Sequence, residues 1–200
     1  MDKQKFEAYI SGFLRQNSKL NLISKNDEKF LWGKHIYDSL AIENFFNKYN
    51  INDFNNKKLL DIGTGGGFPS IPISLNYPEL EVTALDSIRK KISAITEIKQ
   101  ELEIHNLIPL CDRAENLKGQ KFDYITSRAV AALKILIHYA IPLLKDNGYF
   151  IAYKSLKVND EISEAQSALK KYNAKVIDIM EYKLPLKENH TRNLVIITKS

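Results

Sequence analysis

Residues 59–69 read Leu-Leu-Asp-Ile-Gly-Thr-Gly-Gly-Gly-Phe-Pro and place four of the chain's eight glycines directly after an apolar run. This order predicts a strand that turns sharply, passes its backbone close to a nucleotide-like ligand and then starts a helix, because glycine tolerates positive φ and has no side chain. Asp86 ends the next apolar run, 19 residues after Gly67. An acid at that distance lies at the tip of the second strand and can accept both ribose hydroxyls. The two features together predict a nucleoside cofactor.

The chemistry of this turn favours a cationic cofactor over a phosphate-bearing one. Pro69 occupies the first helical turn and removes one of the backbone N–H donors that a pyrophosphate needs. No lysine follows the glycines, which excludes the phosphate-cradling loop of nucleotide triphosphatases, and Asp61 would repel a nearby phosphate. The turn suits S-adenosylmethionine, with adenosine towards Asp86 and the cationic methionine end near residues 61–67. A tight strand–helix turn without a ligand is the alternative that these residues leave open.

From residue 58 onwards the apolar pattern alternates between strand and helix, which indicates a mostly parallel sheet covered by helices on both faces. We expect helices at 69–76, 88–104, 130–144 and 158–172. We expect strands at 58–62, 81–86, 107–111, 122–127, 148–154, 175–183 and 191–198. A polar loop from Pro185 to His190 joins the last two strands. It predicts a terminal hairpin, and hence one antiparallel strand in a sheet of seven.

Two amphipathic helices are expected before this α/β region. Residues 4–16 carry apolar side chains at helical spacing, and Asp27 is expected to cap a second helix over about 28–49. The Asn- and Lys-rich patch at 47–58 is the predicted boundary. We therefore expect an N-terminal helical extension at 1–50, packed on a cofactor-binding domain at 51–200.

Four segments resemble one known family. The stretch Asp61-Ile-Gly-Thr-Gly-Gly-Gly-Phe-Pro-Ser-Ile-Pro72 resembles the glycine motif of the small-subunit ribosomal RNA methyltransferase G family, also called the glucose-inhibited division protein B family. Asn21-Leu-Ile with Lys34-His-Ile-Tyr-Asp-Ser-Leu40 resembles its N-terminal signature. Thr126-Ser-Arg-Ala-Val-Ala131 resembles its segment after the fourth strand, and residues 192–199 resemble its closing strand. The resemblance implies a Rossmann-like class I S-adenosylmethionine-dependent methyltransferase fold that methylates N7 of a guanine in 16S ribosomal RNA.

The resemblance also implies most of the cofactor contacts, and the turn and Asp86 supply the others. The predicted cofactor-binding residues are Gly63, Gly65, Gly67, Phe68, Asp86, Ala114, Glu115 and Arg128. Taken alone, Arg128 fits a methionine carboxylate, an RNA phosphate or a bare surface position. Glu115 fits the purine edge or a helix N-terminus. Because Arg128 is expected in a loop beyond its strand, we expect it to contribute little to the core.

The requirements of methyl transfer limit which atom of a base can accept the methyl group. An in-line displacement mainly requires that donor and acceptor be held together. Cytosine C5 would need a nucleophilic cysteine, but Cys111 is expected to be a buried small hydrophobe. Exocyclic amines normally use an Asn/Asp-Pro-Pro-Tyr/Phe segment, where this chain has Ser127-Arg128-Ala129. Guanine N7 loses no proton, so no general base is predicted.

Three residues are candidates for positioning the substrate. His35 and Asp38 lie three apart and hence on one helix face, and both could point at the cofactor mouth together with Arg128. A purely structural role for His35 is the alternative that its spacing leaves open.

The net charge of +5 suits a polyanionic partner. Only five of the 29 basic residues are arginines, and most of these fall near the C-terminal ends of predicted strands, where open α/β sheets bind ligands. The predicted RNA-binding residues are Lys34, Arg89, Arg113 and Arg192, and the predicted partner is 16S ribosomal RNA or the small ribosomal subunit. The competing functions are a small-molecule methyltransferase and a non-catalytic RNA-binding or assembly factor on the same fold.

A single cysteine excludes an intramolecular disulfide and fits a reducing compartment. The chain has no apolar stretch long enough to span a bilayer, no apolar signal region at its start and no paired Cys/His spacing for zinc. We therefore expect a cytoplasmic monomer without a membrane segment or a metal.

Overall fold

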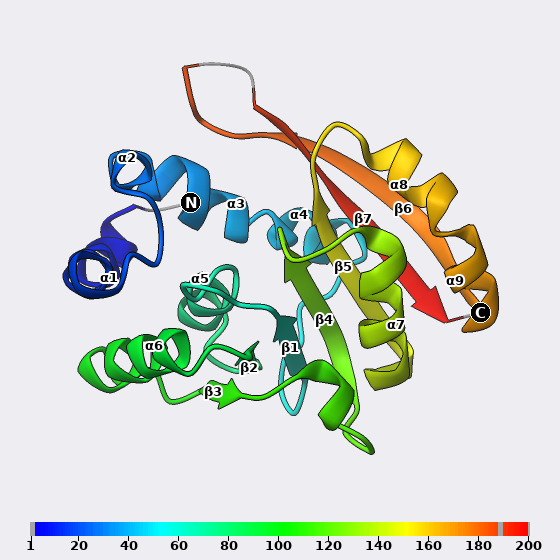
Figure 1. Ribbon diagram of the computed structural model, residues 1–200, viewed down its shortest axis with the longest axis horizontal. Coiled ribbons are helices and arrows are strands. Elements are labelled where there is room, and N and C mark those ends of the chain that lie inside the picture. Colours follow the sequence, from blue (N-terminus) through cyan, green and yellow to red (C-terminus); the bar gives the residue numbers. More distant parts are fainter. Residues whose placement is uncertain (1–2, 188–189, 200) are drawn as a thin grey trace.

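A seven-stranded sheet crosses the centre of the molecule in the computed structural model, which describes residues 3–187 and 190–199 (Figure 1). The strand order is β3-β2-β1-β4-β5-β7-β6. Only β7 runs antiparallel to its neighbours, β5 and β6, which confirms the predicted sheet and its terminal hairpin. Part of the predicted loop, residues 188 and 189, lies outside the described residues. The strands are β1 (Lys58–Ile62), β2 (Glu81–Asp86), β3 (Leu107–Cys111), β4 (Phe122–Arg128), β5 (Leu144–Lys154), β6 (Ala174–Lys183) and β7 (Thr191–Lys199).

Helices cover both faces because the connections run outwards in two directions from the centre of the sheet. The connections put α5 (Ser70–Asn76) and α6 (Arg89–Glu101) on one face, and α7 (Leu133–Leu143) on the other. α8 (Val158–Glu164) and α9 (Gln166–Lys171) join α7 there (Figure 1). The sheet separates two hydrophobic cores, one on each face. Successive side chains of β1 point to opposite faces, so Leu59 lies in the core under α5 and α6 and Leu60 in the core under α7.

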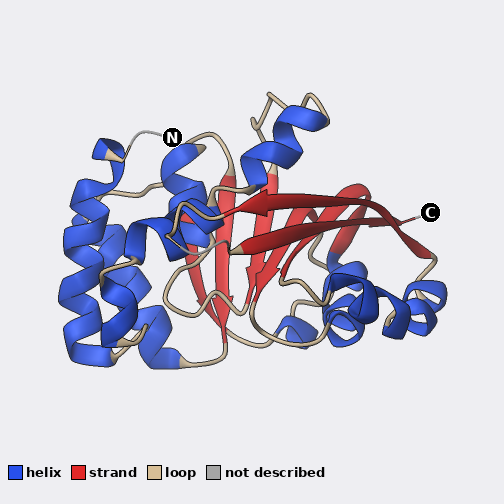
Figure 2. Cartoon of the chain, turned by 90° about the horizontal axis from the view of Figure 1, so that it is seen from above, coloured by secondary structure: helices blue, strands red, loops and turns tan. Residues whose placement is uncertain are grey.

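The N-terminal helices complete the first face. α1 (Glu7–Leu20) packs on α6, and α4 (Ile42–Lys48) lays Phe45 and Phe46 against Tyr149 and Tyr124 of the sheet. α5 and α6 cover the β1–β3 half, so these aromatic side chains fill the apolar surface over β4 and β5. The remaining N-terminal elements are η1 (Gln4–Phe6), α2 (Lys25–Glu28), η2 (Leu31–Ile36) and α3 (Tyr37–Ser39). In Figure 1 the N-terminal helices run from α1 and α2 on the left to α4 near the centre, and Figure 2 shows helices on either side of the strands.

The single helix predicted over 28–49 is wrong. The region is divided into α2, the π-helical η2, α3 and α4. Residues 38–42 are all buried, which one face of a regular helix cannot provide, so packing overrides the helical periodicity. Asp27 is not the cap either: Ser24 is the N-cap, and its side chain accepts a hydrogen bond from the Asp27 backbone N–H.

Three further differences follow from tertiary context. The helix predicted from 130 begins at Leu133, because residues 129–132 form a loop in which Ala129 has φ +56°. The helix predicted over 158–172 divides at Ala165. Cys111, predicted to be buried, is exposed, because β3 is one of the two edge strands of the sheet.

Candidate functional site

A cavity of about 570 Å³ opens at the carboxyl ends of β1, β2 and β4. The chain leaves β1 towards β2 on one side and reaches β4 on the other, so this is the point at which the strand order reverses. Open α/β sheets bind their ligands at such a point. The glycine turn after β1 forms one wall, the tip of β2 a second, and the segments after β3 and β4 the others.

The glycine turn brings bare backbone to the cavity. Gly63 and Gly65 have φ of +72° and +60° and line the cavity, as does Gly66. A Cβ built on Gly65 would meet only the Gly63 carbonyl oxygen, at 4.0 Å, so open space lies beside this backbone. Gly67, a predicted contact, is not part of the lining. A Cβ there would come within 2.4 Å of Ile71 Cδ1, so this glycine serves the packing of α5.

Asp86 lies at the tip of β2, on the cavity wall and only 7% exposed. Its carboxylate accepts hydrogen bonds from the backbone N–H of Gly65 (3.0 Å) and of Ile88 (2.9 Å), and it pairs with Lys91 at 3.6 Å. Asp86 therefore ties the glycine turn to the second strand. A carboxylate has about four lone-pair sites, so acceptor capacity is left for ribose hydroxyls.

Replacing Asp86 with alanine is expected to weaken S-adenosylmethionine binding by about 1–3 kcal/mol, because ribose hydroxyls would lose their acceptor in a partly buried site. Titration calorimetry on the purified variant measures the change. Glu81→Ala, at the other end of β2 and on the surface, is the matched control and should bind the cofactor like the wild type. An unchanged affinity in Asp86→Ala would remove Asp86 from the ribose site.

On the β3 side, the wall of the first cavity contains Ala114 and Glu115. They belong to the short helix η3 (Ala114–Asn116) that follows β3. Ala114 is buried and Glu115 is exposed. Both line the cavity on the β3 side, together with Arg113. Their predicted contact with the cofactor stays a prediction.

Asp61 does not lie on the cavity wall, although the sequence suggested that it faces the cationic end of a cofactor. It is fully buried, and its Oδ1 accepts a hydrogen bond from Thr126 Oγ1 at 3.0 Å. Its Oδ2 has no hydrogen-bond partner among the described residues. Burial raises the pKa of Asp61 to about 6. The acid that opens the motif is thus an interior group behind the turn.

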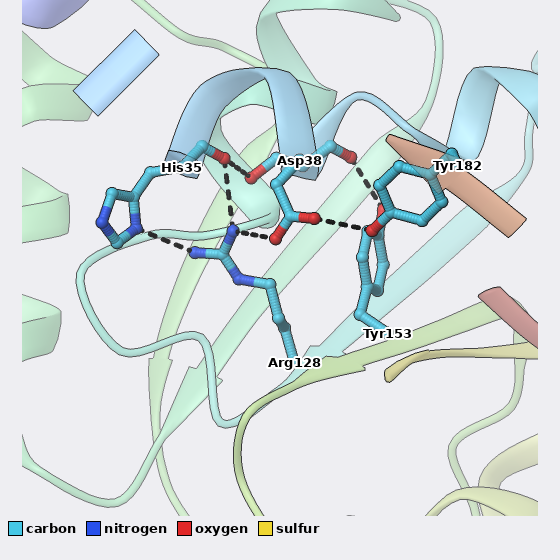
Figure 3. Close-up of polar contacts among 6 residues, drawn as sticks. His35, Asp38, Arg128, Tyr153 and Tyr182 are labelled. Atoms are coloured by element: carbon cyan, nitrogen blue, oxygen red, sulfur yellow. Dashed lines mark hydrogen bonds and ion pairs between the residues drawn. The ribbon is translucent and has the colours of Figure 1, made fainter. Parts of the chain in front are cut away.

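Arg128, the last residue of β4, lies between His35 and Asp38 (Figure 3). Its Nη1 donates to Asp38 Oδ2 at 2.8 Å and to the His35 carbonyl oxygen at 3.3 Å. Its guanidinium also lies 5.3 Å from the centre of the Phe68 ring. The Arg128 and Asp38 side chains are 14% and 7% exposed, so this is a buried ion pair, and the expectation that Arg128 contributes little to the core is wrong.

Two tyrosines hold the segment of Asp38 and Ser39 from the other side, Tyr182 of β6 and Tyr153 of β5. The Tyr182 hydroxyl donates to Asp38 Oδ1 at 2.6 Å, and the Tyr153 hydroxyl donates to the Ser39 carbonyl oxygen at 2.7 Å (Figure 3). Burial and the adjacent Asp38 raise the pKa of Tyr182 far above its usual value. Tyr182 and Asp38 are 144 residues apart in the chain, and no local sequence pattern indicates that they meet. Both tyrosines were therefore missed.

His35 packs its ring on Phe68, at 5.1 Å between ring centres. Burial, assisted by the Arg128 charge, lowers the pKa of His35 to about 4, so the imidazole is neutral at pH 7. A guanidinium can only donate, and hence the 3.4 Å contact makes His35 Nδ1 an acceptor and leaves the proton on Nε2. That buried Nε2 has no partner in the part of the chain that the structure describes.

A second cavity of about 590 Å³ adjoins the first. Both cavities are lined by His35, Arg128, Ala129 and Val130, whereas Asp38 lines only the second. Val130 packs so closely over Gly63 that a Cβ at Gly63 would meet it at 2.4 Å. The loop after β4 is therefore the partition between two adjacent cavities.

The predicted RNA-binding residues lie around this edge of the sheet. Arg89 and Arg113 are exposed, and Arg113 lines the first cavity. Arg192 and Lys34 line the second, but Lys34 is already paired with Asp27. The antiparallel register places Asn193 opposite Lys154, the last residue of β5. This pairing brings Arg192 to the same edge.

The described ranges, 3–187 and 190–199, contain no helix that is both long and apolar enough to cross a membrane. Within the same ranges, no three His, Cys, Asp or Glu side chains are grouped so that they could hold a metal ion.

The residues present fit S-adenosylmethionine. Gly65 presents bare backbone, Asp86 at the tip of β2 has a carboxylate that suits a ribose, and Arg128 has a guanidinium that suits the methionine carboxylate. This sheet, with that cavity at its switch point, defines a class I S-adenosylmethionine-dependent methyltransferase. The model of the rRNA small subunit methyltransferase G family matches residues 2–195. The chain belongs to that family.

Curated relatives carry the name of the same family. The chain is 37% identical over 202 residues to "Ribosomal RNA small subunit methyltransferase G" of Staphylococcus aureus (strain JH9), and 34% identical over 201 residues to the protein of that name from Bacillus licheniformis. Each match covers 98% of this chain and 82% of the relative.

Solved structures share the fold. M. jannaschii TYW2, in complex with AdoMet, aligns with a TM-score of 0.60 at 18% identity, over 80% of this chain and 76% of that one. A precorrin-6y C5,15-methyltransferase from Geobacter metallireducens aligns with a TM-score of 0.58 at 18% identity, over 90% and 92%. At such identities the likeness extends to the fold alone.

Proposed function

We propose that this methyltransferase modifies N7 of a guanine in 16S ribosomal RNA. The observation that carries the proposal is the pair of cavities divided by residues 128–130. One has the wall chemistry of a nucleoside cofactor site, and the other offers room for an acceptor next to it. Family membership and the printed names of the relatives support a small-subunit ribosomal RNA as the substrate. S-adenosylmethionine, when bound, supplies the sulfonium methyl group.

The groups where the cavities meet support an acceptor that loses no proton. Both oxygens of Asp38 accept hydrogen bonds, from Arg128 and Tyr182. His35 Nδ1 faces the guanidinium of Arg128. Guanine N7 carries an in-plane lone pair and gives up no proton when methylated, so the protein needs only to hold the base in line.

The roles of the cavity residues belong to the same proposal. Gly63, Gly65 and Phe68 let the cofactor approach the turn, and Asp86 accepts from its ribose. Ala114 and Glu115 meet the adenine, and Arg128 meets the methionine carboxylate. We also propose a helical extension at 1–50 on a methyltransferase domain at 51–200, acting as a monomer in the cytoplasm.

The direct test maps modified guanosines in 16S ribosomal RNA from cells with and without this protein, followed by transfer of labelled methyl groups to unmodified RNA and subunits in vitro. We expect one 7-methylguanosine that depends on the protein. Label that stays on small molecules, or on a different ribosomal RNA atom, would contradict the proposal.

The salt dependence of RNA binding tests where the RNA lies. Each phosphate contact contributes about −0.7 to the slope of log affinity against log salt for single-stranded RNA. Arg192→Ala should reduce the slope by up to about one unit. Lys34→Ala should reduce it by less, because Asp27 already pairs with Lys34. Filter binding over a salt series measures these slopes.

The matched control is the double variant Lys170→Ala/Lys171→Ala. Both lysines are exposed at the end of α9, and the nearby Ala174 pairs with Lys199, at the far end of β7 from Arg192. The double variant should bind RNA like the wild type. Loss of RNA affinity there, with Arg192→Ala unaffected, would place the RNA on another face.

A further inference from the structure

The wall of the second cavity away from the cofactor side, formed by β5 and α8, carries a partly buried lysine–glutamate pair. Lys154, at the end of β5, is 9% exposed, and its Nζ donates to Glu161 Oε2 at 2.7 Å and to the Ala131 carbonyl oxygen at 2.9 Å. Glu161 comes from α8, and its side chain is 26% exposed. Both residues line the cavity. Neither was identified from the sequence.

The two oxygens of Glu161 differ in their surroundings. Oε2 accepts from Lys154 Nζ and also from the backbone N–H of Leu133, at 2.8 Å, at the start of α7. No described residue donates to Oε1. In Asp38, the other carboxylate of this cavity, both oxygens are occupied. Oε1 is therefore the carboxylate oxygen of the cavity that is left to accept from a ligand, and its partners fix its position.

Guanine fits this arrangement by its shape. If N7 faces the cofactor cavity across residues 128–130, the N1–H and the 2-amino group point to the opposite wall, because they lie on the other side of the purine. These are the donors that distinguish guanine from adenine, whose N1 is an acceptor. A carboxylate oxygen attracts the two donors of guanine and repels the N1 acceptor of adenine. Proteins commonly recognise single-stranded bases at this edge.

We propose that Glu161 is the guanine-specificity residue, with Oε1 accepting from the N1–H and the 2-amino group of the target base and Lys154 holding the carboxylate in place. The inference rests on the proposed function, since it assigns the second cavity to the acceptor base.

The test uses Glu161→Gln. The donors at Lys154 and Leu133 retain the amide oxygen at the Oε2 position, so the amide NH₂ turns to the base and opposes its donors. Glu164→Gln is the matched control, because Glu164 lies in the same helix, exposed and paired only with Lys134. The substrate is 16S ribosomal RNA with guanosine, or inosine, at the position that the wild-type enzyme methylates. Inosine lacks only the 2-amino group.

We expect the wild type and Glu164→Gln to prefer guanosine over inosine by about tenfold or more in kcat/KM, because inosine keeps the N1–H but loses the second donor to Glu161 Oε1. Glu161→Gln should lose about a hundredfold on guanosine and the preference for it, while S-adenosylmethionine binding by calorimetry stays unchanged. A Glu161→Gln enzyme that keeps the wild-type preference would overturn the inference, as would a wild type indifferent to inosine, a result that does not depend on the variant folding. Absence of any methyl transfer to guanosine by the wild type would instead refute the proposed function.

Discussion

Arg128→Ala is expected to lower the free energy of unfolding by about 3 kcal/mol and to reduce methyl transfer by about tenfold to a hundredfold. Removing one partner of a buried ion pair leaves the other charge uncompensated, and the remaining Asp38 carboxylate is only 7% exposed. The loss of transfer follows from the proposed contact of Arg128 with the methionine carboxylate, since charge-assisted hydrogen bonds contribute about 1.5–3 kcal/mol. Urea unfolding and single-turnover methyl transfer measure the two effects.

A second substitution separates stability from activity. Asp38→Asn in the Arg128→Ala background removes the stranded charge and keeps an oxygen for the Tyr182 hydroxyl, so it should restore part of the stability. It should not restore methyl transfer. Arg15→Ala is the control, because Arg15 pairs with Glu101 at the surface, where such pairs contribute about 1 kcal/mol or less. If Arg128→Ala unfolds like Arg15→Ala, the buried pair does not stabilise the fold.

The sequence predicted those parts of the fold and site that depend on local pattern. The glycine turn and the acid at the β2 tip both lie within residues 59–86, and the cavity-lining positions of Gly63 and Asp86 follow from them. Ala114 was expected from the family resemblance. The strand range 81–86 agrees with β2, because an apolar run flanked by polar residues marks a buried strand clearly.

What the sequence could not show depends on residues far apart in the chain. Tyr182 meets Asp38 only because the C-terminal hairpin returns over the N-terminal helices. Glu161 and Lys154 acquire their role from a cavity whose other wall lies more than 100 residues earlier, at His35. Cys111 is exposed because β3 ends the strand order, which the apolar run around it does not reveal.

Two buried groups near the cofactor cavity should give opposite pH dependences of stability. Burial raises the pKa of Asp61 from 3.8 to about 6. The folded state then binds the proton more tightly than the unfolded state, so this residue lowers stability as pH rises from about 4 to 6. Burial lowers the pKa of His35 from 6.5 to about 4. The unfolded state then binds more protons between about 4 and 6.5, so His35 raises stability over nearly the same range.

Each shift of about two pKa units corresponds to about 3 kcal/mol, so the two slopes largely cancel in the wild type between pH 4 and 6.5. Single substitutions should expose them. Relative to the wild-type profile, the stability of Asp61→Asn should gain about 3 kcal/mol as pH rises across this range, because the opposing contribution of Asp61 is removed. The stability of His35→Asn should lose a similar amount relative to the wild-type profile, because the contribution of His35 is removed. Urea unfolding of the three proteins at half-unit pH steps provides the measurement. Parallel profiles in all three proteins would show that neither group titrates in the folded interior as its burial requires.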